Sequence, residues 1–342
     1  MQTMGRWTRQ FSLRFRILAA LVLACNFLLV SSPVAAQGDI DQALFERLRW
    51  ARFELVRGRL EVCDIRRGQN RSITVDHHEI MVREHISFRI DNQDLLLHYE
   101  RKGPQDSLIL DVHGNRLLTL RWIPTSPEKK EVLYHQDLKQ VRFQLGGENG
   151  QEYHAVHLWL MFLEHPDDCQ RHLVPVLETL RQNWQLGRSL DNVETNLIRT
   201  ALAPPTIDMD SLREKIRELG SGPYRQRRAA DLAIRSMGQE IVGILAEIDS
   251  RHLNAEQRLR IRRICESMSF RSADTPLSVT SWLKSSPSAW LCLMKHPDTT
   301  IRVSSHQRLA WLTGNPVPFN PNASPAIRAR QIATLREDLL RR

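Results

Sequence analysis

The chain has 342 residues and a formal net charge of +9, and only seven of its 48 basic residues are lysine. The 306 residues that follow position 36 correspond to about two ordinary domains. A nucleic-acid partner would require a basic stripe interleaved with stacking aromatic side chains, and the sequence has the charge without the aromatics. We therefore expect no nucleic-acid partner.

Residues 1–36 have the layout of a secretory signal peptide. An arginine-containing segment without acidic residues precedes the apolar run 17–30, and small residues follow up to Ala36. We expect cleavage after Ala36 and export to the periplasm, the cell envelope or the extracellular space. The four arginines of the segment are Arg6, Arg9, Arg14 and Arg16.

Two alternatives would keep the protein at a membrane. The signal could remain as an anchor, but its apolar run of 14 residues is shorter than the roughly 20 that a spanning helix needs. Cys25 could be lipidated, but the apolar run continues past it to Val30, which is not typical of a lipoprotein signal. Membrane contact is expected only if one of these alternatives holds.

The charge is unevenly spread along the rest of the chain. Residues 203–342 contain 22 basic and 14 acidic residues, a net charge of +8, which leaves −3 for residues 37–202. An acidic first half and a basic second half indicate two domains.

Four cysteines follow the signal: Cys63, Cys169, Cys265 and Cys292. An oxidising compartment would allow one bridge in each half, Cys63 with Cys169 and Cys265 with Cys292. A small buried thiol on a strand or helix is the equally acceptable alternative.

From about residue 48 the hydrophobic period is close to two. Ile86, Phe88 and Ile90 alternate with polar residues, and similar runs over 95–101, 108–112, 117–123 and 141–145 are separated by short turns. This pattern predicts an antiparallel meander of seven to nine strands in one curved or sandwiched sheet.

After about Tyr153 the period becomes helical. Leu173, Leu177, Leu180 and Trp184 form one stripe of an amphipathic helix. Asp167 or Asp168 can cap its start, and the preceding segment 157–164 is apolar nearly all round. We expect both helices to cover one face of the sheet.

The segment Ala203-Pro204-Pro205-Thr206 interrupts the helical pattern, because prolines remove donors and restrict the preceding residue. Later residues show four short helical stripes, with glycines and prolines at their ends. The predicted fold class is α+β: an antiparallel β domain over 37–202, closed by helices, and an all-α domain over 203–342. The stripes contain Leu212, Ile216, Leu219; Ala229, Leu232, Ala233, Met237; Ile241, Ile244, Leu245, Ile248; and Ile261, Ile264, Cys265, Met268.

Two stretches of the second half resemble each other, and both resemble the HEAT-repeat pattern. Residues 219–230, ending at Met237-Gly238, and residues 294–302, continuing to Gly314, each contain a short turn, an arginine and then small and apolar residues. Residues 312–328 resemble the terminal segment of exported bacterial HEAT-like proteins, whereas residues 251–290 depart from the pattern. Over 207–342 the resemblance implies stacked helical repeats, in which Arg227 and Arg302 support turns.

The densest polar cluster is Asp76-His77-His78-Glu79. It resembles the start of a zinc-protease motif, but Val82 stands where that motif needs histidine. Ile73, Val75 and Ile80 around it indicate strands rather than the helix that would align two imidazoles. We therefore expect a solvent-exposed hairpin.

His165, Cys169 and His172 have the spacing of metal ligands, with His154 and His157 nearby. Zinc takes four ligands, or three and a water, and no fourth ligand is evident. The sequence also lacks a phosphate loop, a dinucleotide fingerprint and a serine elbow. We expect a non-catalytic protein without a cofactor or metal, and these three residues are its weak metal candidates.

One predicted helix carries four arginines beside its apolar stripe: Arg258, Arg260, Arg262 and Arg263. They form either a solvated face or a surface that binds an anion or a partner. Our first hypothesis is an exported binding or scaffold protein whose helical repeats contact another envelope or secreted protein. One alternative is a carrier of an apolar or lipid-like ligand in the β domain. Another is a metal-dependent hydrolase with a site around His154, His157, His165 and Cys169.

Overall fold

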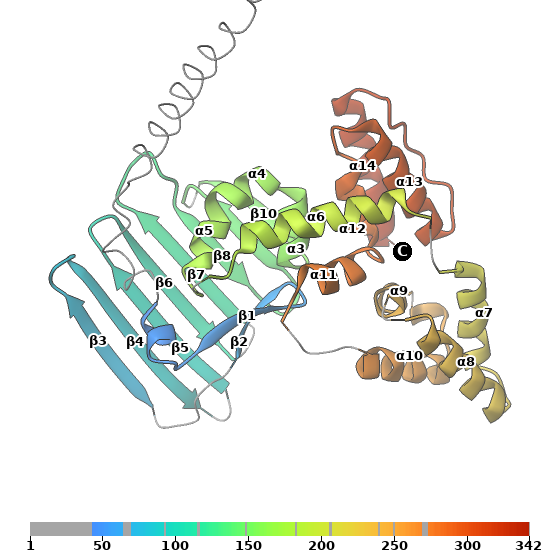
Figure 1. Ribbon diagram of the computed structural model, residues 1–342, viewed down its shortest axis with the longest axis horizontal. Coiled ribbons are helices and arrows are strands. Elements are labelled where there is room, and N and C mark those ends of the chain that lie inside the picture. Colours follow the sequence, from blue (N-terminus) through green and yellow to red (C-terminus); the bar gives the residue numbers. More distant parts are fainter. Residues whose placement is uncertain are drawn as a thin grey trace, which may run out of the picture. The chain divides into compact units, whose positions relative to one another are not determined.

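The computed structural model describes residues 43–341, except 64–69, 92–93, 115–116, 148, 182, 205–206, 239, 249 and 269–272. The predicted signal peptide, its cleavage site after Ala36 and Cys25 lie outside the described residues. An antiparallel β region is followed by a helical region, so the fold class is α+β (Figure 1). Within the described ranges, no helix is both long enough and apolar enough to cross a membrane.

Eight antiparallel strands form the main sheet, and each pairs with its neighbours along the chain. Inward residues such as Ile86, Tyr99, Leu110 and Leu120 are fully buried, as the period of two predicts. The predicted antiparallel meander is confirmed. Its strands are β3 (Arg71–His77), β4 (Val82–Asp91), β5 (Asp94–Lys102), β6 (Asp106–His113), β7 (Leu117–Pro124), β8 (Val132–Gln136), β9 (Val141–Leu145) and β10 (Gln151–Ala155).

A separate hairpin of β1 (Arg52–Val56) and β2 (Arg59–Cys63) packs on the inward face of this sheet. Its two-residue turn is Arg57–Gly58, and both residues have positive φ, 54° and 69°, as a primed hairpin turn requires. The side-chain amide of Gln136, which is fully buried, donates to the Leu60 carbonyl and accepts from the Leu60 N–H, each at 2.8 Å. One side chain thus fixes the hairpin to β8 as a peptide group would.

Asp274 fixes the other end of this hairpin. Its carboxylate accepts from the backbone N–H groups of Arg57 at 2.8 Å and Gly58 at 2.6 Å, and from the Trp159 indole at 2.7 Å. The Asp274 N–H donates to the Leu55 carbonyl at 2.7 Å. Successive N–H groups of such a turn form a concave site for an anion, and here a side chain from the helical region occupies it.

The helices that follow the sheet contact its inward face at β8 and β10 (Figure 1). The predicted helix through Leu173 and Trp184 is wrong at its C-terminal end: it stops at Glu178, and Trp184 lies in a loop with left-handed residues at Asn183 and Gln185. The Glu178 carboxylate instead caps the next helix by accepting from Leu186 N–H at 2.6 Å. The elements are α3 (Leu158–Glu164), α4 (Pro166–Asp168), the π-helical turn η1 (Cys169–Leu173), α5 (Val174–Glu178) and α6 (Leu186–Leu202).

Neither Asp167 nor Asp168 caps this helical segment. Pro166 occupies the first position of α4, with His165 at the capping position and no side-chain cap. The fixed φ of proline suits that first position, so the helix starts before the two aspartates. The Asp168 carboxylate accepts a hydrogen bond from the Tyr153 hydroxyl instead.

The helices after the predicted boundary at 203–206 belong to two buried clusters. Residues 205 and 206 of that boundary lie outside the described chain. The larger cluster joins the sheet and α3–α6 to α11–α14, and the smaller one contains α7–α10. Two hydrogen bonds tie α13 and α14 to α6 and α3. Arg308 donates to the Thr200 carbonyl at 2.6 Å, and Arg336 donates to Glu164 at 2.8 Å. The bounds are α7 (Met209–Leu219), α8 (Tyr224–Ser236), α9 (Ile241–Glu247), the 3₁₀ turn η2 (Ser250–His252), α10 (Ala255–Met268), α11 (Pro276–Leu283), α12 (Pro287–Leu293), α13 (Thr299–Thr313) and α14 (Pro325–Arg341). The short α2 (Leu44–Arg47) precedes β1.

We predict that Gly58→Ala destabilises the protein by about 1–3 kcal/mol, because φ is positive there and the added Cβ would lie 3.0 Å from His157 Cβ and from Trp159 Cδ1. Urea unfolding measures the change. The control is Gly222→Ala, where no atom lies within 4 Å of the new Cβ and φ is not positive, and it should stay within about 0.5 kcal/mol of the wild type. Equal stability of both variants would contradict the account of the turn.

Candidate functional site

The Asp76-His77-His78-Glu79 cluster lies at the turn between β3 and β4, so the predicted hairpin is confirmed. His78 and Glu79 are exposed. His77 differs from the expectation, because it is half-buried and its Nε2 lies 3.0 Å from Glu84 Oε2.

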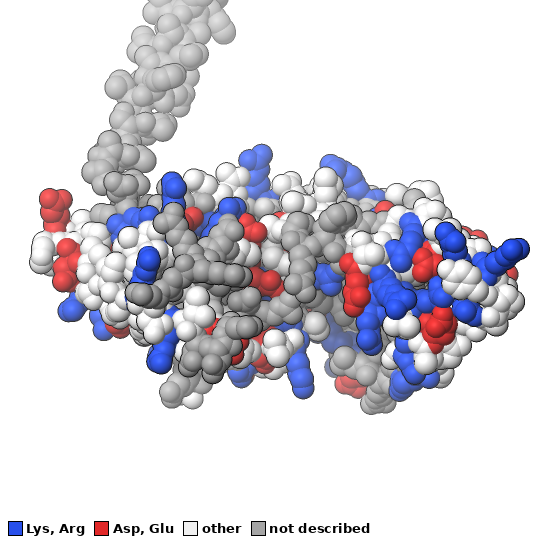
Figure 2. All heavy atoms as spheres, turned by 90° about the horizontal axis from the view of Figure 1, so that it is seen from below, with Lys and Arg blue, Asp and Glu red and all other residues white. Residues whose placement is uncertain are grey.

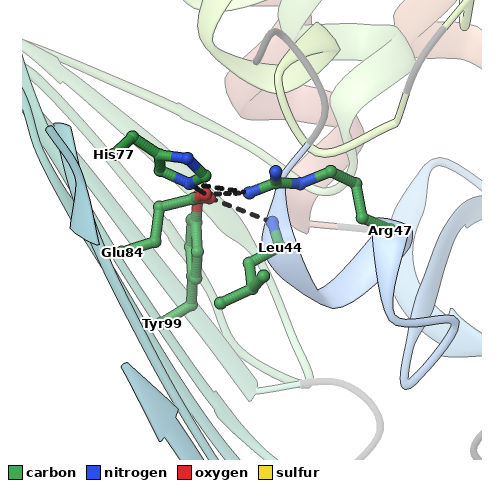
Figure 3. Close-up of polar contacts among 5 residues, drawn as sticks. All are labelled: Leu44, Arg47, His77, Glu84 and Tyr99. Carbon is green, nitrogen blue, oxygen red and sulfur yellow. Dashed lines mark hydrogen bonds and ion pairs between the residues drawn. The ribbon is translucent and has the colours of Figure 1, made fainter. Parts of the chain in front are cut away.

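Glu84 is the centre of a polar network between α2 and the sheet (Figure 3). The residue is only 1% exposed. Its Oε1 accepts from Leu44 N–H at 3.0 Å and from the Tyr99 hydroxyl at 2.6 Å, while Oε2 accepts from Arg47 and His77. Both carboxylate oxygens are therefore occupied by donors from the protein itself.

This network holds the first helix on the sheet. Burial, and then the neighbouring Glu84 charge, raise the pKa of Tyr99, so the phenol remains a donor at neutral pH. A carboxylate that is inaccessible and fully hydrogen-bonded cannot act on a substrate. The sequence carried a signal for this site, since Glu84 shares the inward face of β4 with Ile86 and Phe88, where only a paired carboxylate is tolerated.

We predict that Arg47→Met lowers the free energy of unfolding by about 3 kcal/mol, because it leaves a buried carboxylate without its permanent cation. The matched control is Arg83→Met, which removes an exposed guanidinium 3.5 Å from Asp76 and should cost less than about 0.5 kcal/mol. Chemical denaturation compares the two. Similar losses in both variants would show that the Glu84 network is not a main anchor of α2.

The weak metal candidates are not brought together. The Cys169 thiol is buried and donates to the Met161 carbonyl, and the His165 ring packs on Tyr153 with centroids 4.4 Å apart. Burial raises the pKa of Cys169, which keeps the thiol protonated. The described chain contains no group of three or more His, Cys, Asp or Glu residues, His172 included, that could hold a metal ion.

The two histidines near this segment lie on different surfaces. His154 is exposed on β10, whereas His157 occupies the capping position of α3, where its Nδ1 accepts from Leu160 N–H at 3.1 Å. Neither disulfide that the spacing allows, Cys63 with Cys169 or Cys265 with Cys292, is formed in the described part of the chain. Burial raises the pKa of Cys292 to about 12.

Burial, and then the nearby Arg59 guanidinium, lower the pKa of His157 from 6.5 to about 3. The unfolded chain therefore binds a proton that the folded chain excludes, and stability falls as the pH drops from about 6.5 toward 3. We predict a loss of about 3 kcal/mol from this group between pH 7 and pH 4. His157→Asn keeps a capping acceptor without titrating. Its unfolding free energy, measured across this range, should fall less steeply than that of the wild type, and parallel curves would refute the assignment.

Arg227 and Arg302, the arginines of the HEAT-like stretches, make the same contacts. Each is the fourth residue of its helix, and each Nη1 donates to the carbonyl groups five and six residues earlier in the preceding turn. Arg258 in α10 and Arg328 in α14 also occupy the fourth position and donate to the carbonyl five residues earlier, Leu253 and Ala323. Arg258, a candidate for partner binding, is therefore engaged in a turn.

The remaining arginines of that candidate cluster differ in their surroundings. Arg260 donates to Glu256 at 2.6 Å, whereas Arg262 and Arg263 are exposed and make no ion pair with the described residues. α8 lies beside α10, with Arg227 paired to Glu256 near the start of both helices and Arg235 bonded to Ser267 near their ends.

α8 adds two exposed arginines, Arg225 and Arg228, for which no carboxylate partner is found in the described ranges. α8 and α10 also carry large exposed apolar side chains: Tyr224 at 60%, Leu232 at 58% and Leu259 at 41%. The predicted stripe through Leu232 is therefore wrong, since α8 buries Ala230 and Ile234. Lys and Arg side chains are dense on the part of the surface formed by α7–α10, at the right of Figure 2. We call the following set the α8–α10 face: Tyr224, Arg225, Arg228, Leu232, Leu259, Arg262 and Arg263. The sequence did not identify Arg225 and Arg228 as members of this surface, because only the packing of α8 beside α10 brings them to the same face as Arg262.

Comparisons with protein-family models, with curated protein sequences and with solved structures give no match.

Proposed function

We propose that this chain is a non-catalytic binding protein, working outside the cytoplasm, whose α8–α10 face contacts an acidic surface of another protein. One observation carries the proposal: four exposed arginines without a carboxylate partner among the described residues stand beside three exposed apolar side chains. A guanidinium presents a planar fork that matches a carboxylate, so unpaired arginines suit an acidic partner.

The composition of the face favours a protein over other anions. It contains four arginines, one tyrosine and two leucines, and no lysine. Arginine and tyrosine are enriched at protein interfaces, where lysine is depleted. The resemblance to HEAT repeats agrees with this role, because the repeat arginines support turns and leave the outer helix faces available.

Packing disfavours both alternatives. The inward face of the sheet is filled by Tyr134, Phe143, Trp159 and Phe162, each less than 2% exposed, which leaves little room there for an apolar cargo. The hydrolase would need His154, His157 and His165 to converge, and they do not. His154 is exposed on a strand, His157 caps the start of α3, and His165 packs on the Tyr153 ring.

A photo-crosslinking residue at Leu232 tests the proposal in the native organism. We expect one predominant protein adduct, identified by mass spectrometry, whose contact segment is acidic. The purified partner should bind the wild-type chain with an affinity that falls as the salt concentration rises. The double variant Arg262→Glu/Arg263→Glu should bind this partner at least about tenfold more weakly.

The matched control is Arg83→Glu/Arg89→Glu, which reverses two exposed arginines of β4 and should leave the affinity unchanged. Equal loss in both double variants would indicate a general charge effect and refute the assignment to the α8–α10 face. If the chain binds vesicles of anionic phospholipid and no protein, the proposed protein partner is wrong and the face binds a membrane.

A further inference from the structure

A cavity of about 280 Å³ lies at the junction of the two buried clusters. It is half open and is bordered by the end of α6, by α9 and by the segment from the end of α11 to α13, and no residue of the α8–α10 face lines it. Its lining contains charged and aromatic side chains together. The lining residues are Arg199, Thr200, Ala203, Pro204, Ile207, Glu240, Ile244, Lys284, Ser285, Trp290, Arg308 and Trp311.

Arg308 is the most unusual group in this lining. The residue is 7% exposed, and its Nη2 donates to the carbonyl groups of Thr200 and Ala203 at the end of α6. These neutral acceptors orient the guanidinium without cancelling its charge. Burial lowers the pKa of Arg308, with Glu240 opposing the effect, which is the signature of a cation held in poorly solvated surroundings.

The other charges of the lining offset this cation only in part. Glu240, whose charge acts on Arg308, also forms an ion pair with Lys284. Arg199 is exposed at the rim, where its Nη1 donates to the Asn196 side chain at 3.2 Å. The lining therefore has two guanidinium groups in excess of its carboxylate, and a buried charge of this kind is stabilised by an anion.

The walls between these charges are apolar. The Trp290 indole is fixed by its hydrogen bond to the Lys284 carbonyl at 2.8 Å, and the Trp311 ring lies 5.8 Å from the Arg308 guanidinium carbon. Ile207 and Ile244 complete this surface. The volume is slightly below the range of roughly 300–1,000 Å³ that is common for drug-sized ligands, which favours a small molecule.

We propose that this cavity is a binding site for a small organic carboxylate with an aromatic or short aliphatic body. The carboxylate contacts Arg308 and Arg199, and the body packs against Trp290, Trp311 and the isoleucines. One free amphipathic acid of this kind fits the cavity and neutralises one of its two excess positive charges. The inference does not depend on the proposed protein partner, because none of the residues of the α8–α10 face lines the cavity.

Isothermal titration of the full chain with phenylacetate and with phenylacetamide tests the charge requirement, because the two probes share one body. We expect one molecule of phenylacetate per chain and at least about tenfold weaker binding of the amide. Octanoate should bind as an aliphatic carboxylate, and inorganic phosphate, which lacks an apolar body, should not. Absence of carboxylate binding up to about 10 mM, or equal binding of the amide, would overturn the proposal.

Arg199→Gln tests the location, because this rim residue makes few contacts and its loss should leave the fold intact. We expect at least about a fivefold loss of phenylacetate affinity. Arg188→Gln is the control on the same helix, outside the lining, and should bind as the wild type does. Arg308→Lys should also weaken binding, with circular dichroism confirming that the chain is folded. Unchanged affinity in Arg199→Gln, or an equal loss in Arg188→Gln, would exclude this cavity as the site.

Discussion

The carboxylate of Asp274 connects three segments that are distant in the sequence: the β1–β2 hairpin, α3 and the start of α11. Three donors converge on it: two N–H groups of the β1–β2 turn and the Trp159 indole of α3. Asp274 directly precedes Thr275, the N-cap of α11, so one side chain sets the position of a hairpin, a covering helix and the start of α11. The turn must adopt positive φ at both central residues to present these donors, which explains why Gly58 occupies the second position.

The same principle recurs at Gln136 and Glu84. Each polar side chain is buried and satisfies backbone groups that would otherwise lack partners: Leu60 for Gln136 and Leu44 for Glu84. An unpaired buried amide or carboxylate is costly, so these contacts select one placement of the covering segments on the sheet. Within the larger cluster, apolar packing supplies most of the driving force, and the polar contacts determine position.

Periodicity predicted the sheet because apolar and polar residues alternate strictly in segments such as 86–90 of β4 and 141–145 of β9. It failed at Trp184, because the helix already stops at Glu178 without a glycine to mark its end, and Trp184 lies between the left-handed residues Asn183 and Gln185. Hydrophobic periodicity also could not predict that α11–α14 share the core of the sheet, because contacts between distant segments leave no local sequence pattern. At the candidate surface, the sequence identified Arg262 and Arg263 but could not exclude Arg258, whose engagement depends on the fold of the preceding turn.

The chain order of the larger cluster has a consequence for how it is completed. Phe45 and Phe53 near one end of the described chain share this cluster with Ile332 and Leu335 near the other. Helices α7–α10, by contrast, form most of the smaller cluster and are contiguous in sequence, with Trp311 and Leu312 of α13 packed against it. During synthesis, most of the smaller cluster can therefore form while the C-terminal helices are still being made, whereas the core of the sheet requires those helices. The region whose strands come first acquires its full core last.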